Sequence, residues 1–204
     1  MAREGFDISK PVIIWDGNSL MYRSYNNGYV TADLNTLLGS GEYDSYNISV
    51  GGQTVDDMQG RLAANVLPLL NRHKTVIYIC QPGRNQLKLT ADTPAQVLAK
   101  VQTLFQTVKD QVSSTITLSV LTSASTLGGG DPTVMTDIPI LNGLISAESS
   151  GYIDYKYDLY NNGNGFDDVS NKPPFNADEV HYAASASGEG VHSDDITTYA
   201  VTLI

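Results

Sequence analysis

Short apolar segments alternate with helix-like segments along the chain, and this alternation constrains the fold more than any other feature. The apolar segments have the length of strands and cover residues 11–15, 46–50, 74–80, 115–121 and 152–159. Between them lie stretches with apolar residues at three-to-four spacing, the pattern of an amphipathic helix. Strands that alternate with helices favour βαβ units. We therefore predict an α/β fold with a mostly parallel five-stranded sheet.

Local end signals predict where several helices begin. Thr54 followed by Asp57 has the pattern of an N-cap with an acid in the first turn. Thr93-Pro94 places a capping residue before a proline at the first helical position. We expect the other helices over residues 29–38, 138–147 and 194–204. We expect polar loops over residues 127–132, at the functional edge of the sheet, and over residues 161–189.

The composition excludes several classes of function. The chain has 204 residues, 41% of them hydrophobic, and a formal net charge of -10, and we predict one domain over residues 1–204. Its negative field repels phosphate backbones and anionic membranes, so we expect neither nucleic acid nor membrane as a partner.

The single cysteine, Cys80, excludes an intrachain disulfide. Residues 1–6 begin no long apolar stretch, so no secretory signal peptide is expected. The carboxylates lack metal-ligand spacing and no phosphate-binding glycine loop is present, so no metal and no cofactor is expected.

Four short blocks carry the functional signal. The first, Gly17-Asn18-Ser19-Leu20, displays a serine at the carboxyl end of a predicted strand, where ligands bind in open α/β folds. The others are Gly51-Gly52-Gln53-Thr54, Gly83-Arg84-Asn85 and Asp178-Glu179-Val180-His181. In this order the blocks resemble those of the SGNH (GDSL-like) hydrolases. The resemblance implies a flavodoxin-like three-layer α/β/α sandwich. The third block is similar to versions in phage tail-fibre and polysaccharide-processing members.

The resemblance also implies a catalytic mechanism. Ser19 is the implied nucleophile, and it needs a base because a free serine hydroxyl is a weak nucleophile near neutral pH. His181 is the implied base, and Asp178 would accept its other ring N–H and stabilise the imidazolium. The implied oxyanion hole consists of the backbone N–H groups of Ser19 and Gly52 and the side-chain amide of Asn85.

The choice of the histidine stays open at the level of sequence. A second acid–base pair, Glu189 and His192, directly precedes the last predicted helix, where the family's histidine commonly stands. The first pair has the usual aspartate and matches the block better. In the first block Asn18 replaces the usual aspartate, and we expect it to bond the local backbone. We expect Arg84 to be a solvated surface side chain.

These features predict a cofactor-free serine esterase that removes small acyl groups, in the first place acetyl, from a carbohydrate. The carbohydrate rests on the family subtype and on a composition rich in Asn and Ser with 12 tyrosines. The alternative is a non-catalytic carbohydrate-binding or structural module of a phage fibre on the same scaffold. The two differ in whether a histidine lies within hydrogen-bond reach of Ser19. The predicted location is a phage virion or the cytoplasm, and a fibre component would form a homo-oligomer.

Overall fold

A five-stranded parallel sheet forms the centre of the molecule. The computed structural model describes residues 9–71, 75–122, 132–159, 161–162, 181 and 184–204. Its strands are β1 (Val12–Gly17), β2 (Asp44–Asn47), β3 (Val76–Gln81), β4 (Ile116–Val120) and β5 (Tyr155–Tyr157). They lie in the order β2-β1-β3-β4-β5, and every neighbouring pair is parallel. This is the flavodoxin-like order, so the predicted fold class is confirmed.

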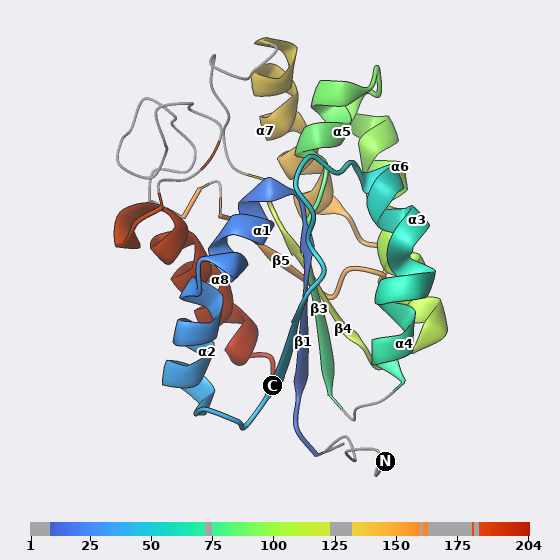
Figure 1. Cartoon of the computed structure of the whole chain (residues 1–204). Helices are drawn as coiled ribbons and strands as arrows, with labels where there is room; N and C mark the ends of the chain where they lie inside the picture. Colours follow the sequence, from blue (N-terminus) through green and yellow to red (C-terminus); the bar gives the residue numbers. More distant parts are fainter. Residues whose placement is uncertain (1–8, 72–74, 123–131, 160, 163–180, 182–183) are drawn as a thin grey trace.

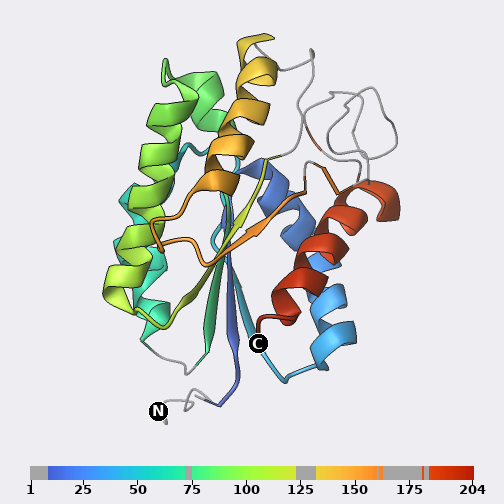
Figure 2. The ribbon, with the colours of Figure 1, turned by 180° about the vertical axis from the view of Figure 1, so that it is seen from behind.

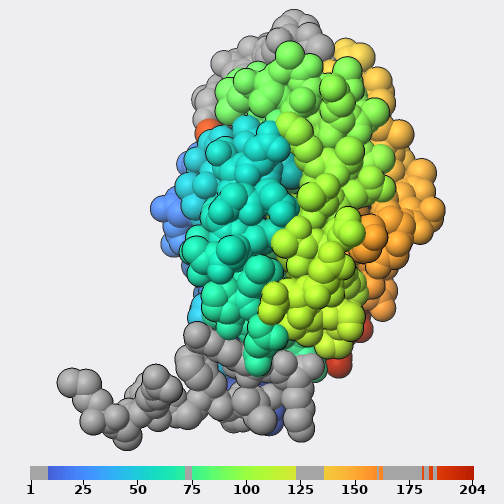
Figure 3. Space-filling model, turned by 90° about the vertical axis from the view of Figure 1, so that its right-hand side faces the viewer, coloured from blue at the N-terminus to red at the C-terminus, as the bar shows by residue number. Residues whose placement is uncertain are grey.

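Helices cover both faces of the sheet (Figures 1 and 2). One layer contains α1 (Ser19–Asn26), α2 (Tyr29–Leu38) and α8 (Val191–Val201), and a π-helical turn, η1 (Ala186–Gly190), leads directly into α8. The other contains α3 (Val55–Asn65), α4 (Leu67–Leu70), α5 (Arg84–Leu89), α6 (Pro94–Gln111) and α7 (Pro132–Ala147). Figure 3 shows α3 and α4 beside α6 on the outer surface of this second layer. The sheet is therefore the middle of three layers.

The interior strand β1 is apolar on both faces because helices cover both. Val12 and Ile14 belong to the core on the α3 and α6 side, and Ile13 and Trp15 to the core on the α1, α2 and α8 side. All four side chains are fully buried. Burial of one such side chain contributes about 1.5–3 kcal/mol. The strand that leads to Ser19 is thus held from both sides.

Both predicted helix starts are confirmed. Thr54 caps α3, and a capping box joins it to Asp57, whose carboxylate accepts from the Thr54 N–H at 2.9 Å. Thr93 caps α6 in the same way with Gln96, and Pro94 occupies the first helical position. Caps of this kind typically contribute about 1 kcal/mol each.

Two helices appear where none was predicted. Helices α1 and α5 each begin within one of the glycine-containing blocks, directly after β1 and shortly after β3. Both are short, with 8 and 6 residues, so neither offers enough turns for an apolar period. In α5 even the polar residues Arg84, Asn85 and Gln86 are buried. Burial of polar side chains hides a helix from a search for apolar stripes.

Several element boundaries also differ from the prediction. β2 ends at Asn47, because beyond it only single backbone bonds continue the pairing, from Ile48 N to Trp15 O and from Val50 N to Gly17 O. Helix α7 begins at Pro132 and α8 at Val191, both earlier than predicted. The predicted loops cover residues 127–132 and 161–189, and most of these residues lie outside the described part of the chain. No helix in the described part of the chain is long and apolar enough to cross a membrane.

Candidate active site

The turn after β1 places Ser19 at the first position of α1. Gly17 has a φ of 150°, and a Cβ there would lie 2.8 Å from Met21 Cγ, so glycine is required by both backbone and space. Asn18 caps the helix, its Oδ1 accepting from Leu20 N at 3.0 Å. The expected local role of Asn18 is confirmed. The Ser19 side chain, half-buried, stands at the helix N-terminus at the carboxyl end of β1.

A buried carboxylate supports this turn from below. Asp16, which is fully buried, accepts hydrogen bonds from Gly17 N at 2.7 Å and from Tyr78 Oη at 2.6 Å, and it pairs with Arg61. Arg61 of α3 also donates to Ile48 O. Burial raises the pKa of Asp16, against the opposing effect of Arg61 and the hydrogen bonds. These contacts tie β1, β3, α3 and the segment after β2 together beneath Ser19.

The structure brings His181 to Ser19. His181 Nε2 lies 3.0 Å from Ser19 Oγ, a hydrogen-bond distance across 162 residues of sequence. A serine hydroxyl in contact with an imidazole nitrogen is the arrangement that nucleophilic catalysis requires. Asp178, the predicted partner of His181, lies outside the described residues.

The alternative pair, from η1 and α8, contacts a different part of α1. His192 is fully buried, and its Nδ1 lies 2.8 Å from Ser24 Oγ, further along the helix from Ser19. Glu189, also fully buried, pairs with Arg23 at 3.2 Å and accepts from Asn27 Nδ2. Burial lowers the pKa of His192 to about 3, which keeps the ring neutral. Glu189 and His192 therefore join η1 and α8 to α1, and the described contacts of His192 do not include Ser19.

The block that carries Gly52 lies beside the serine, and the block that carries Asn85 is hydrogen-bonded to the Gly52 block. A Cβ at Gly51 would come within 3.8 Å of Ser19 Cβ, so the turn after β2 runs next to the nucleophile. Gly52 has a left-handed φ of 79°, and no atom of the described residues lies within 4 Å of its Cβ position. Asn85 Nδ2 donates to Gln53 O at 3.0 Å. This bond links the start of α5 to the turn that carries Gly52.

Sequence reasoning missed the residues that hold these blocks in place. Gln86 accepts from Val55 N at 3.0 Å and thereby joins α5 to the N-terminus of α3. The expectation for Arg84 is wrong, since its side chain is buried in the short helix α5 and not solvated. Arg61 and Tyr78 carry no local signal either, because their partner Asp16 belongs to a different element.

The sequence matches no protein-family model and no curated protein. Solved structures, in contrast, match almost the whole chain. The acetyl xylan esterase AlAXEase is 17% identical, with a TM-score of 0.68 over 93% of this chain and 98% of its own. A catalytic mutant of Axe2, an acetylxylan esterase from Geobacillus stearothermophilus, is 13% identical, with a TM-score of 0.69 over 95% of each chain. A structure assigned to a GDSL-like lipase from Parabacteroides merdae is 14% identical, with a TM-score of 0.66 over 95% of this chain and 98% of the other.

The chain has the SGNH (GDSL-like) hydrolase fold. Similarity at such low identity establishes the fold, and an SGNH fold can carry different functions, so the activity has to be argued from the site. The described residues contain no group of three or more His, Cys, Asp or Glu side chains placed to hold a metal ion. A serine hydroxyl beside an imidazole nitrogen, as Ser19 and His181 provide here, is chemically suited to nucleophilic attack on a carbonyl.

Proposed function

We propose that the protein is a serine esterase that removes small acyl groups, in particular acetyl, from a carbohydrate. The observation that carries the proposal is the 3.0 Å contact between His181 Nε2 and Ser19 Oγ. The rival reading, a non-catalytic module on the same scaffold, gives no reason for a histidine to meet that serine. The distance thus supports the enzyme.

In the proposed mechanism, Ser19 Oγ attacks the ester carbonyl while His181 Nε2 takes its proton. His181 then returns the proton to the alcohol oxygen of the carbohydrate, which leaves, and the acyl group stays on Ser19. Water, deprotonated by the same imidazole, attacks the carbonyl of this acyl-enzyme. The bond to Ser19 Oγ then breaks, His181 returns the proton to Oγ, and the carboxylic acid is released. Asp178 would accept the Nδ1–H of His181, which fixes the tautomer that leaves Nε2 free to accept.

Three donors would stabilise the negative charge of the tetrahedral intermediate. They are the backbone N–H of Ser19 at the start of α1, the backbone N–H of Gly52, and the amide of Asn85. An amide nitrogen carries two N–H groups, so the bond from Asn85 to Gln53 O uses one and leaves one for the oxyanion. The open space around the Gly52 Cβ position gives a substrate room to approach this backbone.

The acyl and carbohydrate assignments draw on the comparisons and on composition. Two of the similar structures are catalytic mutants of Axe2, in which a serine and a histidine are replaced by alanine. The same two residue types meet here. The phage origin, the virion or cytoplasmic location and the homo-oligomer stay predictions.

Hydrolysis of p-nitrophenyl acetate tests the reaction class. The Ser19→Ala variant should lose at least about 10³ in kcat, because it removes the nucleophile. Ser114→Ala is the matched control, since Ser114 is an exposed serine just before β4, at the opposite edge of the sheet. Retained turnover in Ser19→Ala, or equal loss in Ser114→Ala, would remove Ser19 from the mechanism.

A further inference from the structure

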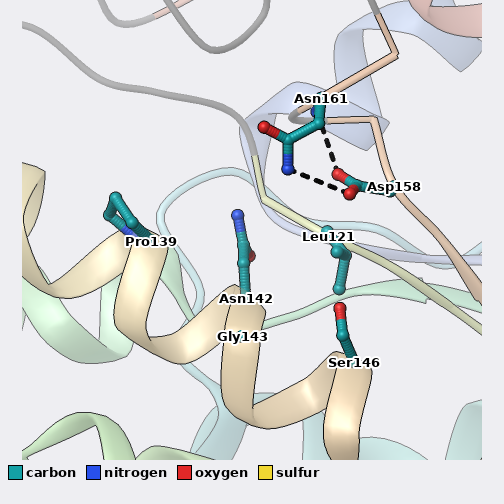
Figure 4. A pocket seen from close by; sticks show the side chains of 7 residues that line it. All are labelled: Leu121, Pro139, Asn142, Gly143, Ser146, Asp158 and Asn161. Atoms are coloured by element: carbon teal, nitrogen blue, oxygen red, sulfur yellow. Dashed lines mark hydrogen bonds between the residues drawn. The ribbon is translucent and has the colours of Figure 1, made fainter.

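A cavity lies at the same edge of the sheet as Ser19. It has a volume of about 230 Å³ and lies between α7 and the carboxyl ends of β4 and β5 (Figure 4). We call it the α7 pocket. Since β3 lies between β1 and β4, the pocket is about two strand spacings, roughly 10 Å, from the strand that carries Ser19. Nothing in the proposed ester chemistry uses it.

The walls of the α7 pocket combine polar groups with small apolar surfaces. Pro139, Gly143 and Ser146 line it from α7, and Leu121 lines it from the end of β4. Across the cavity lies Asp158, which follows β5 (Figure 4). A hydroxyl and a carboxylate beside apolar patches match a ligand with both hydroxyl groups and C–H surfaces.

Hydrogen bonds fix two walls of this pocket. Asn142 Oδ1 accepts from Thr122 N at 3.1 Å, and its Nδ2 donates to Thr122 O at 2.9 Å, which joins α7 to the end of β4. Asp158 accepts from both the backbone N and the Nδ2 of Asn161, each at 2.9 Å. Pockets that are formed in advance bind small ligands without the cost of ordering their walls.

Size and charge narrow the class of ligand. Pockets for drug-sized ligands typically measure about 300–1,000 Å³, so a cavity of about 230 Å³ suits a single small ring. Asp158 is the only charged side chain among the described residues that line it. Together with the net charge of -10, this carboxylate disfavours anionic ligands.

We propose that the α7 pocket binds one uncharged sugar ring of the carbohydrate whose ester lies at Ser19. The identity of the ligand as a carbohydrate rests on the proposed function. The pocket would then hold a neighbouring sugar unit of the same chain and so select esters attached to an oligosaccharide over isolated small esters.

The test measures binding of free sugars, which requires no catalysis. Side-chain amide NMR signals of Asn142 and Asn161 are followed while D-xylose, D-glucose, D-galactose or N-acetyl-D-glucosamine is added, up to about 0.1 M. D-glucuronate is the anionic counterpart of glucose. We expect at least one neutral sugar to shift both signals saturably, and glucuronate to bind at least about tenfold more weakly than glucose.

A pair of helical glycines supplies the variant and its control. Gly143 in α7 and Gly60 in α3 are both exposed, and in the part of the chain that the structure describes nothing lies within 4 Å of either Cβ position. Gly143→Leu fills the pocket and should weaken sugar binding by about tenfold or more, whereas Gly60→Leu should leave it unchanged. Neither variant should unfold at a lower temperature than the wild type, since leucine favours a helix over glycine.

Failure of this proposal is distinguishable from failure of the esterase. If no neutral sugar shifts the signals, if Gly143→Leu binds like wild type, or if glucuronate binds as tightly as glucose, the sugar site is wrong. Hydrolysis of p-nitrophenyl acetate by the wild type would still support the esterase in those cases. Sugar binding without any ester hydrolysis would support the sugar site and count against the esterase.

Discussion

Ser24 of α1 and His192 of α8 form a buried hydrogen bond, with Ser24 Oγ 2.8 Å from His192 Nδ1. The bond joins the helix that begins with the proposed nucleophile to the last helix of the chain. Glu189 of η1 adds contacts to Arg23 of α1 and to Asn27, the residue at the C-terminal cap of α1. Glu189 and His192, the alternative acid–base pair, thus connect two helices, and their loss should destabilise the fold.

Acid should destabilise the protein through His192. Its pKa is about 3 in the folded state, against 6.5 in the unfolded chain, so below pH 6.5 the unfolded state binds a proton that the folded state does not. The free energy of unfolding is therefore unaffected by the titration of His192 above pH 6.5. It falls by about 1.4 kcal/mol for each pH unit as the pH drops from 6.5 toward 3. Urea unfolding between pH 7 and pH 4 should show this slope.

The variant His192→Asn should flatten that slope, because asparagine can bond Ser24 without a titrating ring. Equal slopes in His192→Asn and wild type would show that acid sensitivity has another origin.

The pair Asp16–Arg61 should respond asymmetrically to substitution. Arg61→Leu leaves a buried carboxylate without its cation and should cost about 3–5 kcal/mol of unfolding free energy. Asp16→Asn added to Arg61→Leu should recover part of the loss, since it removes the unpaired charge. A double variant no more stable than Arg61→Leu would argue against this explanation.

The same pair predicts a pH dependence. Burial raises the pKa of Asp16 above its ordinary value, and loss of Arg61 raises that pKa further. The folded state therefore gains a proton before the unfolded state does as the pH falls. The cost of Arg61→Leu, measured by urea unfolding against wild type, should be largest near pH 7 and smaller in acid.

Gly83 should tolerate no side chain. Its φ is 102°, and a Cβ there would lie 2.5 Å from Leu141 Cδ2 of α7. Gly83→Ala should therefore cost about 2 kcal/mol or more. Gly60 lies at a solvent-exposed position in the middle of α3. Gly60→Ala should instead stabilise the fold by up to about 1 kcal/mol. Thermal unfolding of the two variants side by side measures the difference, and similar effects would contradict the packing described at Gly83.

Asn85 should act mainly on the transition state. Asn85→Ala removes the proposed oxyanion donor and should lower kcat for p-nitrophenyl acetate by about 10²–10³, with little change in KM. A thermal unfolding curve checks that loss of the bond to Gln53 O has not unfolded the variant. A change confined to KM would assign Asn85 to substrate binding alone.

The parallel sheet could be predicted from sequence because its causes are local. The apolar run from Val12 to Trp15 has to be buried on both faces, and the pairs Thr54–Asp57 and Thr93–Gln96 cap helices through neighbours three residues apart. Helices α1 and α5 were missed because they are short and partly bury polar side chains.

The site could be predicted in its residues but not in its pairing. His181 and His192 both follow an acid at the same spacing, so only the folded chain shows which ring meets Ser19 and which meets Ser24. The contacts of Asp16 next to the Ser19 turn could not be predicted for a similar reason. These contacts join three elements, through Asp16, Arg61 and Tyr78, and no local sequence pattern predicts them.

Two histidine variants, compared on p-nitrophenyl acetate, test whether the contact between Ser19 and His181 serves catalysis. His181→Ala should lower kcat/KM by about 10³ or more, close to the level of Ser19→Ala, because the nucleophile loses its base. His192→Asn should stay within about tenfold of wild type, since its ring contacts Ser24. Full activity in His181→Ala, or a large loss confined to His192→Asn, would show that His181 is not the base for Ser19.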